Sequence, residues 1–517
     1  MFESQGWMIA QTAITVAVVL IVRYILVQIY SSSIKLNLRT VSENERDLGA
    51  LEIFFEETHK NGGPFICCTL IRLQSAISLS YDVVYKTLMV LAKKHPLLRA
   101  RILERESGEK YRKCFVVNNT NEPVIPLQKH KQFDADEYLE ALEQELHTGF
   151  EDRGLVWRVV YLKEKQNVSE NSFENSLIFV THHGITDGIS AISLAEQFCR
   201  GINITAKANQ EIFDDTESYA MTADLLELIK DEIAWSWWQR LLLIPQTMAL
   251  FFKVFQVCVR IKPVKNIFLD SFPTVAKEDY GRRGKTRIVY KEMDEIETRK
   301  LMKACKANNC TVQGAVAVAW HLATRRLMAT TDSQLQDPCF QWYCPVSVRK
   351  YCKPVVPPDY VGCFVSSVID QIKMPSIETA EEFWAMAQRC TRVLHKQISQ
   401  RKHLHLLRVY DLVDLVKFVP EFKLLTRDPT VHGLTNMGCF YWRSESDLFK
   451  TKQCFLATGN HHYGMIFHNH ISTINGRFNV ATSYFDTVVN GSIAKQLVEL
   501  AFDALQNAGV PRNRVEN

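Results

Sequence analysis

Short apolar runs alternate with longer amphipathic stretches in the first half of the chain. The stretch 80–96 has Asp82 near its start and a proline at its end, and it predicts a helix. Apolar runs of the length expected for buried strands occur on both sides of this helix: 65–74, 97–104, 156–162 and 176–183. The alternation of strand and helix predicts an α/β lobe that ends near residue 230.

The second half of the chain repeats this alternation. Apolar runs predict three strands: 286–293, the first part of 340–352, and 360–372. Periodic stretches predict three helices: 294–309, 311–327 with Thr311 as its N-cap, and 492–509. Asn475-Gly476 stands between two further apolar runs, and this dipeptide is typical of the type I′ turn of a β-hairpin. These elements predict a second lobe at 286–517.

The N-terminus carries a long apolar segment, residues 8–30, which only Arg23 interrupts. As a helix it would be about 35 Å long, enough for a bilayer core of about 30 Å. The positive charges, Arg23, Lys35 and Arg39, all come after Trp7, which favours an anchor over a secretory signal peptide, although Ser31 and Ser33 leave cleavage open. The sequence therefore predicts a membrane anchor at 1–39, a location at the endoplasmic reticulum membrane and a cytosolic catalytic domain.

The region between the lobes, 231–285, combines tryptophans, leucines and basic residues. Its most hydrophobic part, 235–259, predicts either a buried helical linker or a helix pair that lies at a membrane interface. The basic loop GRRGKTR at 281–287 is either ordinary solvated surface or a contact for phosphate groups.

The composition is that of a globular protein, with 47% hydrophobic and 23% charged residues. A net charge of +4 is too small to indicate a nucleic-acid partner. The 14 cysteines include no C-x-x-C pair, so they favour reduced thiols over metal or dithiol chemistry. Asn-X-Ser/Thr sequons keep a secreted glycoprotein open as an alternative.

The most specific motif lies at the end of a predicted strand, where His182 and His183 are followed by Asp187 and Gly188. Four defined residues at this spacing are expected by chance with a probability on the order of 10⁻³. Neighbouring strand side chains point to opposite faces, so only one of the two imidazoles can face a given cleft. An imidazole in a cleft suits a general base near neutral pH. Gly188 permits a close approach, and Asp187 can pair with a cation.

This motif resembles that of the H-H-x-x-x-D-G acyltransferases, which include condensation domains, wax ester synthases, alcohol acyltransferases and relatives of chloramphenicol acetyltransferase. The resemblance covers about residues 40–517, and further segments match the family in order: KKHPLLRAR (93–101), TVQGAVAVAW (311–320), CPVSVRKY (344–351), YVGCFVSS (360–367) and LTNMGCF (434–440). Cys363 stands where the family usually has an asparagine. The resemblance implies an α/β, two-lobed, chloramphenicol-acetyltransferase-like fold with mixed sheets, flanking helices and a tunnel between lobes 40–230 and 286–517.

The resemblance also implies roles for the motif residues. His183 is expected to be the general base in the tunnel, and His182 is expected to be structural. Asp187 is expected to form a salt bridge with Arg349, and Gly188 to keep the tunnel floor clear.

The same resemblance places Asn436 and Gly438 at the border of the bound substrate. No metal or cofactor is expected, and no protein nucleophile is required, because a thioester donor is already activated. The expected partners are acyl-CoA as co-substrate, a hydrophobic alcohol or amine as acceptor, and a membrane. The expected reaction is O-acylation of a lipophilic alcohol, since the chain is free-standing and carries hydrophobic segments.

Three alternatives remain open. An amine acceptor would make the protein an N-acyltransferase or a condensation-type enzyme, because the same base serves an amine. A catalytically inactive binding protein could keep the same fold. Several histidines of the second half could hold a metal, although no acidic or cysteine partner occurs at a familiar zinc spacing: His403, His405, His461, His462, His468 and His470.

Overall fold

The computed structural model describes residues 44–107, 110–118, 122–207, 217–233, 266–272, 284–412, 415–416, 419, 430–459 and 465–508. The predicted anchor at 1–39 and the predicted interfacial segment at 235–259 lie outside these residues, and so do His461 and His462.

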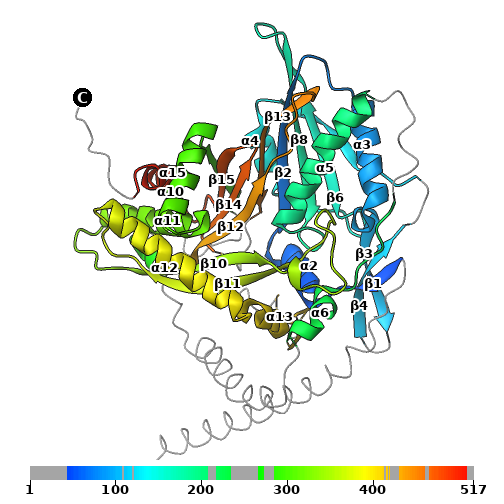
Figure 1. Cartoon of the computed structure of the whole chain (residues 1–517). Coiled ribbons are helices and arrows are strands. Elements are labelled where there is room, and N and C mark those ends of the chain that lie inside the picture. The colour runs from blue at the N-terminus through cyan, green and yellow to red at the C-terminus, as the bar shows by residue number, and fades with distance from the viewer. Residues whose placement is uncertain are drawn as a thin grey trace, which may run out of the picture.

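Two six-stranded mixed sheets form the frame of the molecule, one in each lobe (Figure 1). The first sheet has the order β13-β2-β8-β6-β5, with β7 beside β8. Its strands are β13 (Phe449–Thr458), β2 (Ile66–Ser75), β8 (Ser172–His182), β6 (Trp157–Lys163), β5 (Leu127–Asp134) and β7 (Lys165–Asn167). A small sheet beside it consists of β1 (Glu45–Asp47), β4 (Lys110–Val117) and β3 (Ala100–Ser107).

The second sheet has the order β11-β10-β12-β14-β15-β9. Its strands are β11 (Val365–Lys373), β10 (Cys339–Ser347), β12 (Thr430–Phe440), β14 (Phe467–Ile474), β15 (Arg477–Phe485) and β9 (Thr286–Glu292). Strands β14 and β15 pair through Ile474 and Arg477. Asn475 and Gly476 between them both have positive φ, as a type I′ turn requires, so the predicted hairpin is confirmed.

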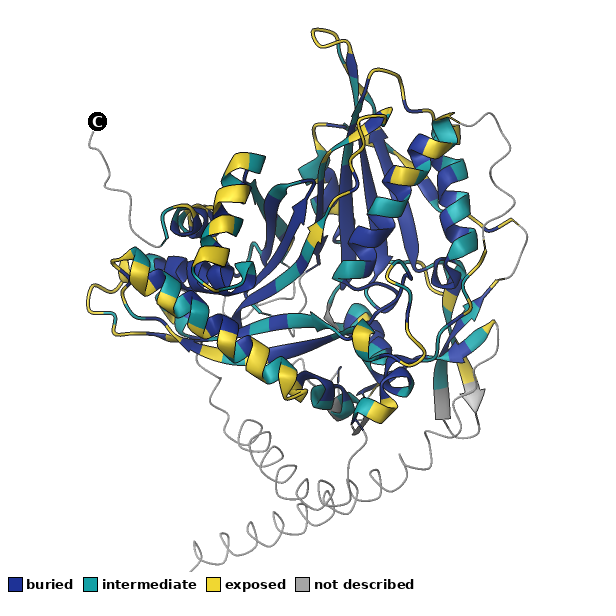
Figure 2. Ribbon diagram, in the orientation of Figure 1, coloured by how far each residue is buried: buried dark blue, intermediate teal, exposed yellow. Residues whose placement is uncertain are grey.

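Helices cover both sheets, and their buried faces meet the strands in Figure 2. The first lobe carries α2 (Ala50–Gly62), α3 (Tyr81–Lys94), η2 (Pro96–Arg99), α4 (Tyr138–Glu145), α5 (Gly188–Lys207), α6 (Leu225–Leu228) and α7 (Lys230–Ile233). The second carries α9 (Ile267–Ser271), α10 (Glu295–Ala307), α11 (Val312–Ala329), η3 (Arg349–Tyr351), α12 (Ala380–Ser399), α13 (Lys402–Leu412) and α15 (Gly491–Gln506). Thr311 caps α11 as predicted, since its hydroxyl accepts a hydrogen bond from Gly314 N at 3.1 Å.

Two predicted strands begin later than their apolar runs. Pro96, directly before the run 97–104, has no amide hydrogen for a ladder and begins the 3₁₀ turn η2 (Pro96–Arg99), so β3 starts at Ala100. In the run 360–372, the first residues form a loop whose backbone bonds to side chains at the lobe junction. Strand β11 therefore starts at Val365.

Strand β13 comes from the second half of the chain but belongs to the first sheet. It pairs antiparallel with β2, from Phe449 opposite Ser75 to Thr458 opposite Cys67. Its buried Phe455 and Leu456 join the cores beneath that sheet. The order of residues along the chain therefore does not separate the two sheets cleanly.

The prediction of a membrane location is corrected by the structure. Among the residues that the structure describes, no helix is both long enough and apolar enough to cross a bilayer. The described residues therefore do not support the assignment to the endoplasmic reticulum membrane.

Candidate active site

A strand, a tight turn and a helix present the two-histidine motif. Strand β8 ends at His182 and helix α5 begins at Gly188. Asp187 is the residue before the helix, and its carboxylate oxygen Oδ1 accepts a hydrogen bond from Ser190 N at 2.7 Å. This is the geometry of a helix N-cap, which satisfies an amide that has no partner within the helix. The aspartate of the motif thus fixes where α5 begins.

His182 is fully buried, with 1% of the residue exposed. Its Nδ1 accepts a hydrogen bond from Gly184 N at 3.0 Å. Its Nε2 lies 3.3 Å from Oε2 of Glu56, a residue of α2. Protein groups thus lie close to both ring nitrogens, Gly184 N in a hydrogen bond and Glu56 at ion-pair distance without an aligned hydrogen bond.

His183 lies in the wall of a cavity that residues of both lobes line. Its imidazole stacks on the ring of Phe55, with 4.1 Å between centroids and an angle of 10° between planes. Nδ1 is the buried nitrogen, so Nε2 is the one that can meet a ligand. Burial lowers the pKa of His183 to about 4, although the carboxylate of Asp187 acts in the opposite direction. The imidazole is therefore neutral at neutral pH and can accept a proton.

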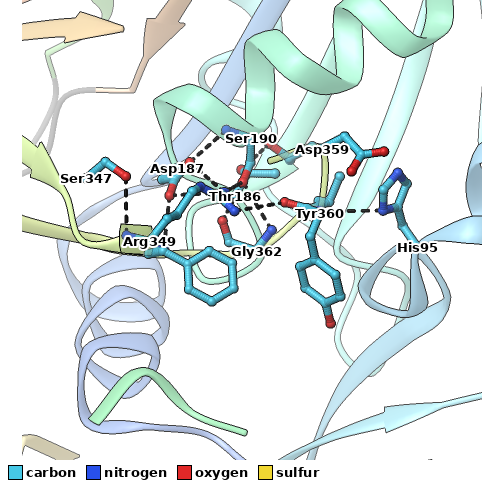
Figure 3. A network of polar contacts seen from close by, with 12 residues as sticks. His95, Thr186, Asp187, Ser190, Ser347, Arg349, Asp359, Tyr360 and Gly362 are labelled. Atoms are coloured by element: carbon cyan, nitrogen blue, oxygen red, sulfur yellow. Dashed lines mark hydrogen bonds and ion pairs between the residues drawn. The ribbon is translucent and has the colours of Figure 1, made fainter. Parts of the chain in front are cut away.

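An ion pair between Asp187 and Arg349 joins the two lobes (Figure 3). Nη2 of Arg349 lies 3.4 and 3.5 Å from the two carboxylate oxygens and 2.5 Å from Ser190 Oγ. Oδ2 of Asp187 also accepts a hydrogen bond from Phe364 N at 2.9 Å. Nη1 of Arg349 donates to Tyr360 O at 3.2 Å. The predicted partners thus meet at the junction between α5 and the β10–β11 segment.

The cavity has a volume of about 420 Å³, within the range of small-molecule sites. Side chains of both lobes line it. Its walls are mostly apolar: Leu51, Phe54, Phe55, Phe65, Pro345, Val365, Ile369, Leu407, Val419, Leu456 and Met465. Its polar groups include the side chains of His183, Asp187, Thr430, Thr435, Thr458, His468 and His470.

The second sheet places two further histidines, His468 and His470, in the cavity wall. Their positions on one face of β14 are visible in the sequence, but only the packing of β14 against β13 brings them to the cavity. Nε2 of His470 lies 3.2 Å from Thr458 Oγ1. Burial lowers the pKa of His470 to about 3, and the charges of His468 and His183 act in the same direction. His470 is thus a second neutral imidazole in the cavity.

Gly188 and the part of β12 that holds Asn436 meet near the cavity. A Cβ atom at Gly188 would lie 2.9 Å from Cγ of Met437, so any larger residue would displace that side chain. Gly188 lines the cavity, whereas Asn436 and Gly438 do not. Oδ1 of Asn436 instead accepts a hydrogen bond from Gly438 N at 3.0 Å, where the pairing of β12 and β14 shifts. The substrate contacts expected of these two residues stay a prediction, since neither residue is part of this cavity wall.

Cys363 is buried against Phe55 and Phe65 behind the cavity. It is not a lining residue, so its difference from the family pattern affects packing rather than the chemistry of the wall. Within the described ranges, no group of three or more His, Cys, Asp or Glu side chains has an arrangement that could hold a metal ion. The expectation that the reaction needs no metal stays a prediction.

Comparisons with known proteins agree with this architecture. Among solved structures, the chain is similar to trichothecene 15-O-acetyltransferase from Fusarium sporotrichioides, with 11% identity, a TM-score of 0.61, and coverage of 92% of this chain and 97% of that one. It is also similar to the epimerization domain from the third module of tyrocidine synthetase B, with 14% identity, a TM-score of 0.59, and coverage of 91% and 98%. At such identities the likeness shows the fold alone, which is the two-lobed mixed α/β fold of these proteins.

Comparison of the sequence with protein-family models shows which family the chain belongs to. A search of curated proteins finds no match. The family model described as alcohol acetyltransferase matches residues 122–501, which include the two-histidine motif, Arg349 and most of the cavity wall. The expected reaction type is confirmed by this match: an acyl group passes from a donor to an alcohol acceptor. The chain therefore belongs to the alcohol acetyltransferase family and is an acyltransferase.

Proposed function

We propose that this enzyme transfers an acyl group from acyl-CoA to the hydroxyl of a lipophilic alcohol, with His183 as the general base. The observation that carries the proposal is the position of His183, a neutral imidazole in the wall of a largely apolar cavity between the lobes. Apolar walls favour a hydrophobic acceptor, because burial of its surface contributes about 25 cal/mol per Å².

The reaction can proceed directly from donor to acceptor. Nε2 of His183 takes the proton of the acceptor hydroxyl as its oxygen attacks the thioester carbonyl. The tetrahedral intermediate then breaks its C–S bond, and the departing thiolate receives the proton from the imidazolium. His183 thus ends neutral, ready for another turnover.

A covalent acyl-enzyme at the cavity cysteine is the less favourable route. Cys67 lines the cavity, but burial raises the pKa of its thiol to about 12. The thiolate is the nucleophilic form of cysteine, and it is scarce at neutral pH when the pKa is this high. This supports direct transfer without a protein nucleophile.

The proposal is tested with purified protein, acyl-CoAs of several chain lengths, and separate pools of long-chain alcohols, sterols and amines. Free thiol release and product mass are followed together. We expect release that depends on the acceptor and an ester as the product. An amide product would reject the O-acyltransferase assignment, and activity only with carrier-protein thioesters would reject acyl-CoA as the donor.

The low pKa of His183 predicts an unusual pH profile. A general base is active when neutral, so kcat/KM should stay flat from about pH 5.5 to pH 8 if its pKa is about 4. An imidazole with the ordinary pKa of about 6.5 would retain only about a quarter of the plateau rate at pH 6. Initial rates at subsaturating substrate, with circular dichroism to verify folding at each pH, distinguish the two profiles. A half-maximal rate near pH 6.5 would contradict the proposed environment of His183.

A further inference from the structure

Two consecutive residues of helix α2 contact the two histidines of the motif. The ring of Phe55 stacks on the imidazole of His183 at 4.1 Å. The carboxylate of Glu56 approaches Nε2 of His182 at 3.3 Å. Phe55 and Glu56 lie far from the motif in sequence, and the motif itself gives no sign of them. Helix α2 therefore helps to hold the two histidines in place from outside the motif.

The hydrogen bond from Gly184 sets the protonation of His182. Because Nδ1 accepts the Gly184 amide hydrogen at 3.0 Å, the ring hydrogen of neutral His182 must be on Nε2. Nε2 lies 3.3 Å from Oε2 of Glu56, at ion-pair distance but without an aligned hydrogen bond, so Glu56 acts on this N–H through its negative charge. Glu56 thus favours the tautomer that keeps Nδ1 free to hold Gly184, the residue directly after His183. If Glu56 were displaced, His182 would hold Gly184 less firmly, and the backbone directly after His183 would be free to move.

Glu56 keeps its negative charge although it is only 5% exposed. Nζ of Lys60 lies 3.0 Å from its Oε1, and Nζ of Lys113 lies 3.7 Å away. Burial acts to raise the pKa of Glu56, but His182 and the two lysines outweigh burial and hold the pKa well below its usual range. The carboxylate is therefore ionised at any pH at which the enzyme works.

The stacking of Phe55 bears on the charged form of His183. During acyl transfer His183 would become an imidazolium in a place with little water. The face of an aromatic ring attracts a cation, and the attraction is stronger where solvent is excluded. Phe55 also limits rotation of the imidazole, so Nε2 keeps its direction toward the cavity.

We propose that Phe55 and Glu56 are positioning residues of the acyl transfer. Glu56 holds the motif turn through His182, and Phe55 fixes the ring of His183 and stabilises its protonated form. This inference rests on the proposed role of His183 as the general base. Helix α2 would then contribute two residues to the active site in addition to the H-H-x-x-x-D-G motif.

The first test compares Glu56→Gln with Glu57→Gln. Glu57 is adjacent on α2, is similarly buried and pairs with Lys113, but it does not contact His182. We expect Glu56→Gln to lower kcat by about ten- to a hundredfold and to change KM by less than about twofold, because misplacement of a catalytic group reduces rate more than binding. In ¹⁵N-histidine spectra, the His182 Nε2–H proton should move upfield in Glu56→Gln only. Equal kcat values for both variants would overturn the role of Glu56.

The second test compares Phe55→Leu with Phe133→Leu. Phe133 stacks on a different histidine, His130, at 4.8 Å and is not part of the cavity wall. We expect Phe55→Leu to lower kcat about five- to thirtyfold, the range of a cation–π contact between exposed and desolvated sites. Phe133→Leu should retain the wild-type kcat. An unchanged kcat in Phe55→Leu would overturn the role of the stacked ring.

Both tests keep this inference separate from the proposed function. If His183→Ala retains activity, the function of His183 is rejected, and so is the basis of this inference. If His183→Ala is inactive while Glu56→Gln and Phe55→Leu match their controls, only the inference is rejected. Should Glu56→Gln unfold, Glu56→Asp replaces it, because it keeps the charge and withdraws the carboxylate from His182; the same loss of kcat is expected.

Discussion

Replacement of His183 by alanine should lower kcat by about 10²–10⁴-fold, the usual contribution of a general base. The KM for both substrates should change little, because the imidazole forms a small part of a wall that is mostly apolar. Initial rates of thiol release at saturating acyl donor measure the effect. The melting temperature should stay close to that of the wild type, since the substitution leaves the Asp187–Arg349 pair intact.

His395→Ala is the matched control for this result. His395 is exposed on α12, far along the chain from the motif, and it does not line the cavity. The control should keep full activity. If His183→Ala were folded and as active as His395→Ala, His183 would not be the base, and the protein would use another group or would act as a binding protein.

Replacement of Arg349 by methionine should destabilise the protein by about 3–5 kcal/mol, the effect of leaving a buried charge without its partner. Both side chains are well buried, with 10% of Arg349 and 4% of Asp187 exposed. At an unfolding entropy of about 2 cal/mol/K per residue, this corresponds to a melting temperature lower by roughly 3–5 °C. Activity should fall as well, because Arg349 also binds Ser190 and the Tyr360 carbonyl across the lobe junction.

Two further variants make this measurement specific. Asp187→Asn in the Arg349→Met background should recover part of the lost stability, since it removes the uncompensated charge but can still accept from Ser190 N. Arg200→Met removes an exposed ion pair with Glu196 on the same helix, and such pairs contribute about 0–1 kcal/mol. Equal effects of Arg349→Met and Arg200→Met would contradict the structural role of the buried pair.

Helix caps and hairpin turns could be predicted from the sequence, because interactions within a few residues determine them. Thr311 caps its helix, and Asn475-Gly476 turns its hairpin, because a side-chain hydrogen bond and a positive φ act within a few residues. The resemblance to a known family supplied the pairing of Asp187 with Arg349, which no local pattern contains.

The rest depends on contacts between distant parts of the chain. Phe55 and Glu56 occupy an ordinary amphipathic helix, and only the packing of α2 against the end of β8 gives them their contacts with the histidines. His470 reaches the cavity because β13 packs beside β14. Asn436 Oδ1 accepts a hydrogen bond from Gly438 N where the pairing of β12 and β14 shifts, and its expected place beside the substrate stays a prediction. Periodicity cannot reveal such arrangements, since it reports only which face of an element is apolar.

The crossing of β13 into the first sheet has a consequence for synthesis of the protein. Strands β2 and β8 leave the ribosome long before β13, which ends at Thr458. At about 5–20 residues per second, translation of the intervening chain takes roughly 14–55 s. Throughout that interval the backbone groups of β2 that later pair with β13 form an open sheet edge, the kind of surface to which other chains can add. The nascent first lobe therefore needs protection against aggregation until its last strand is made.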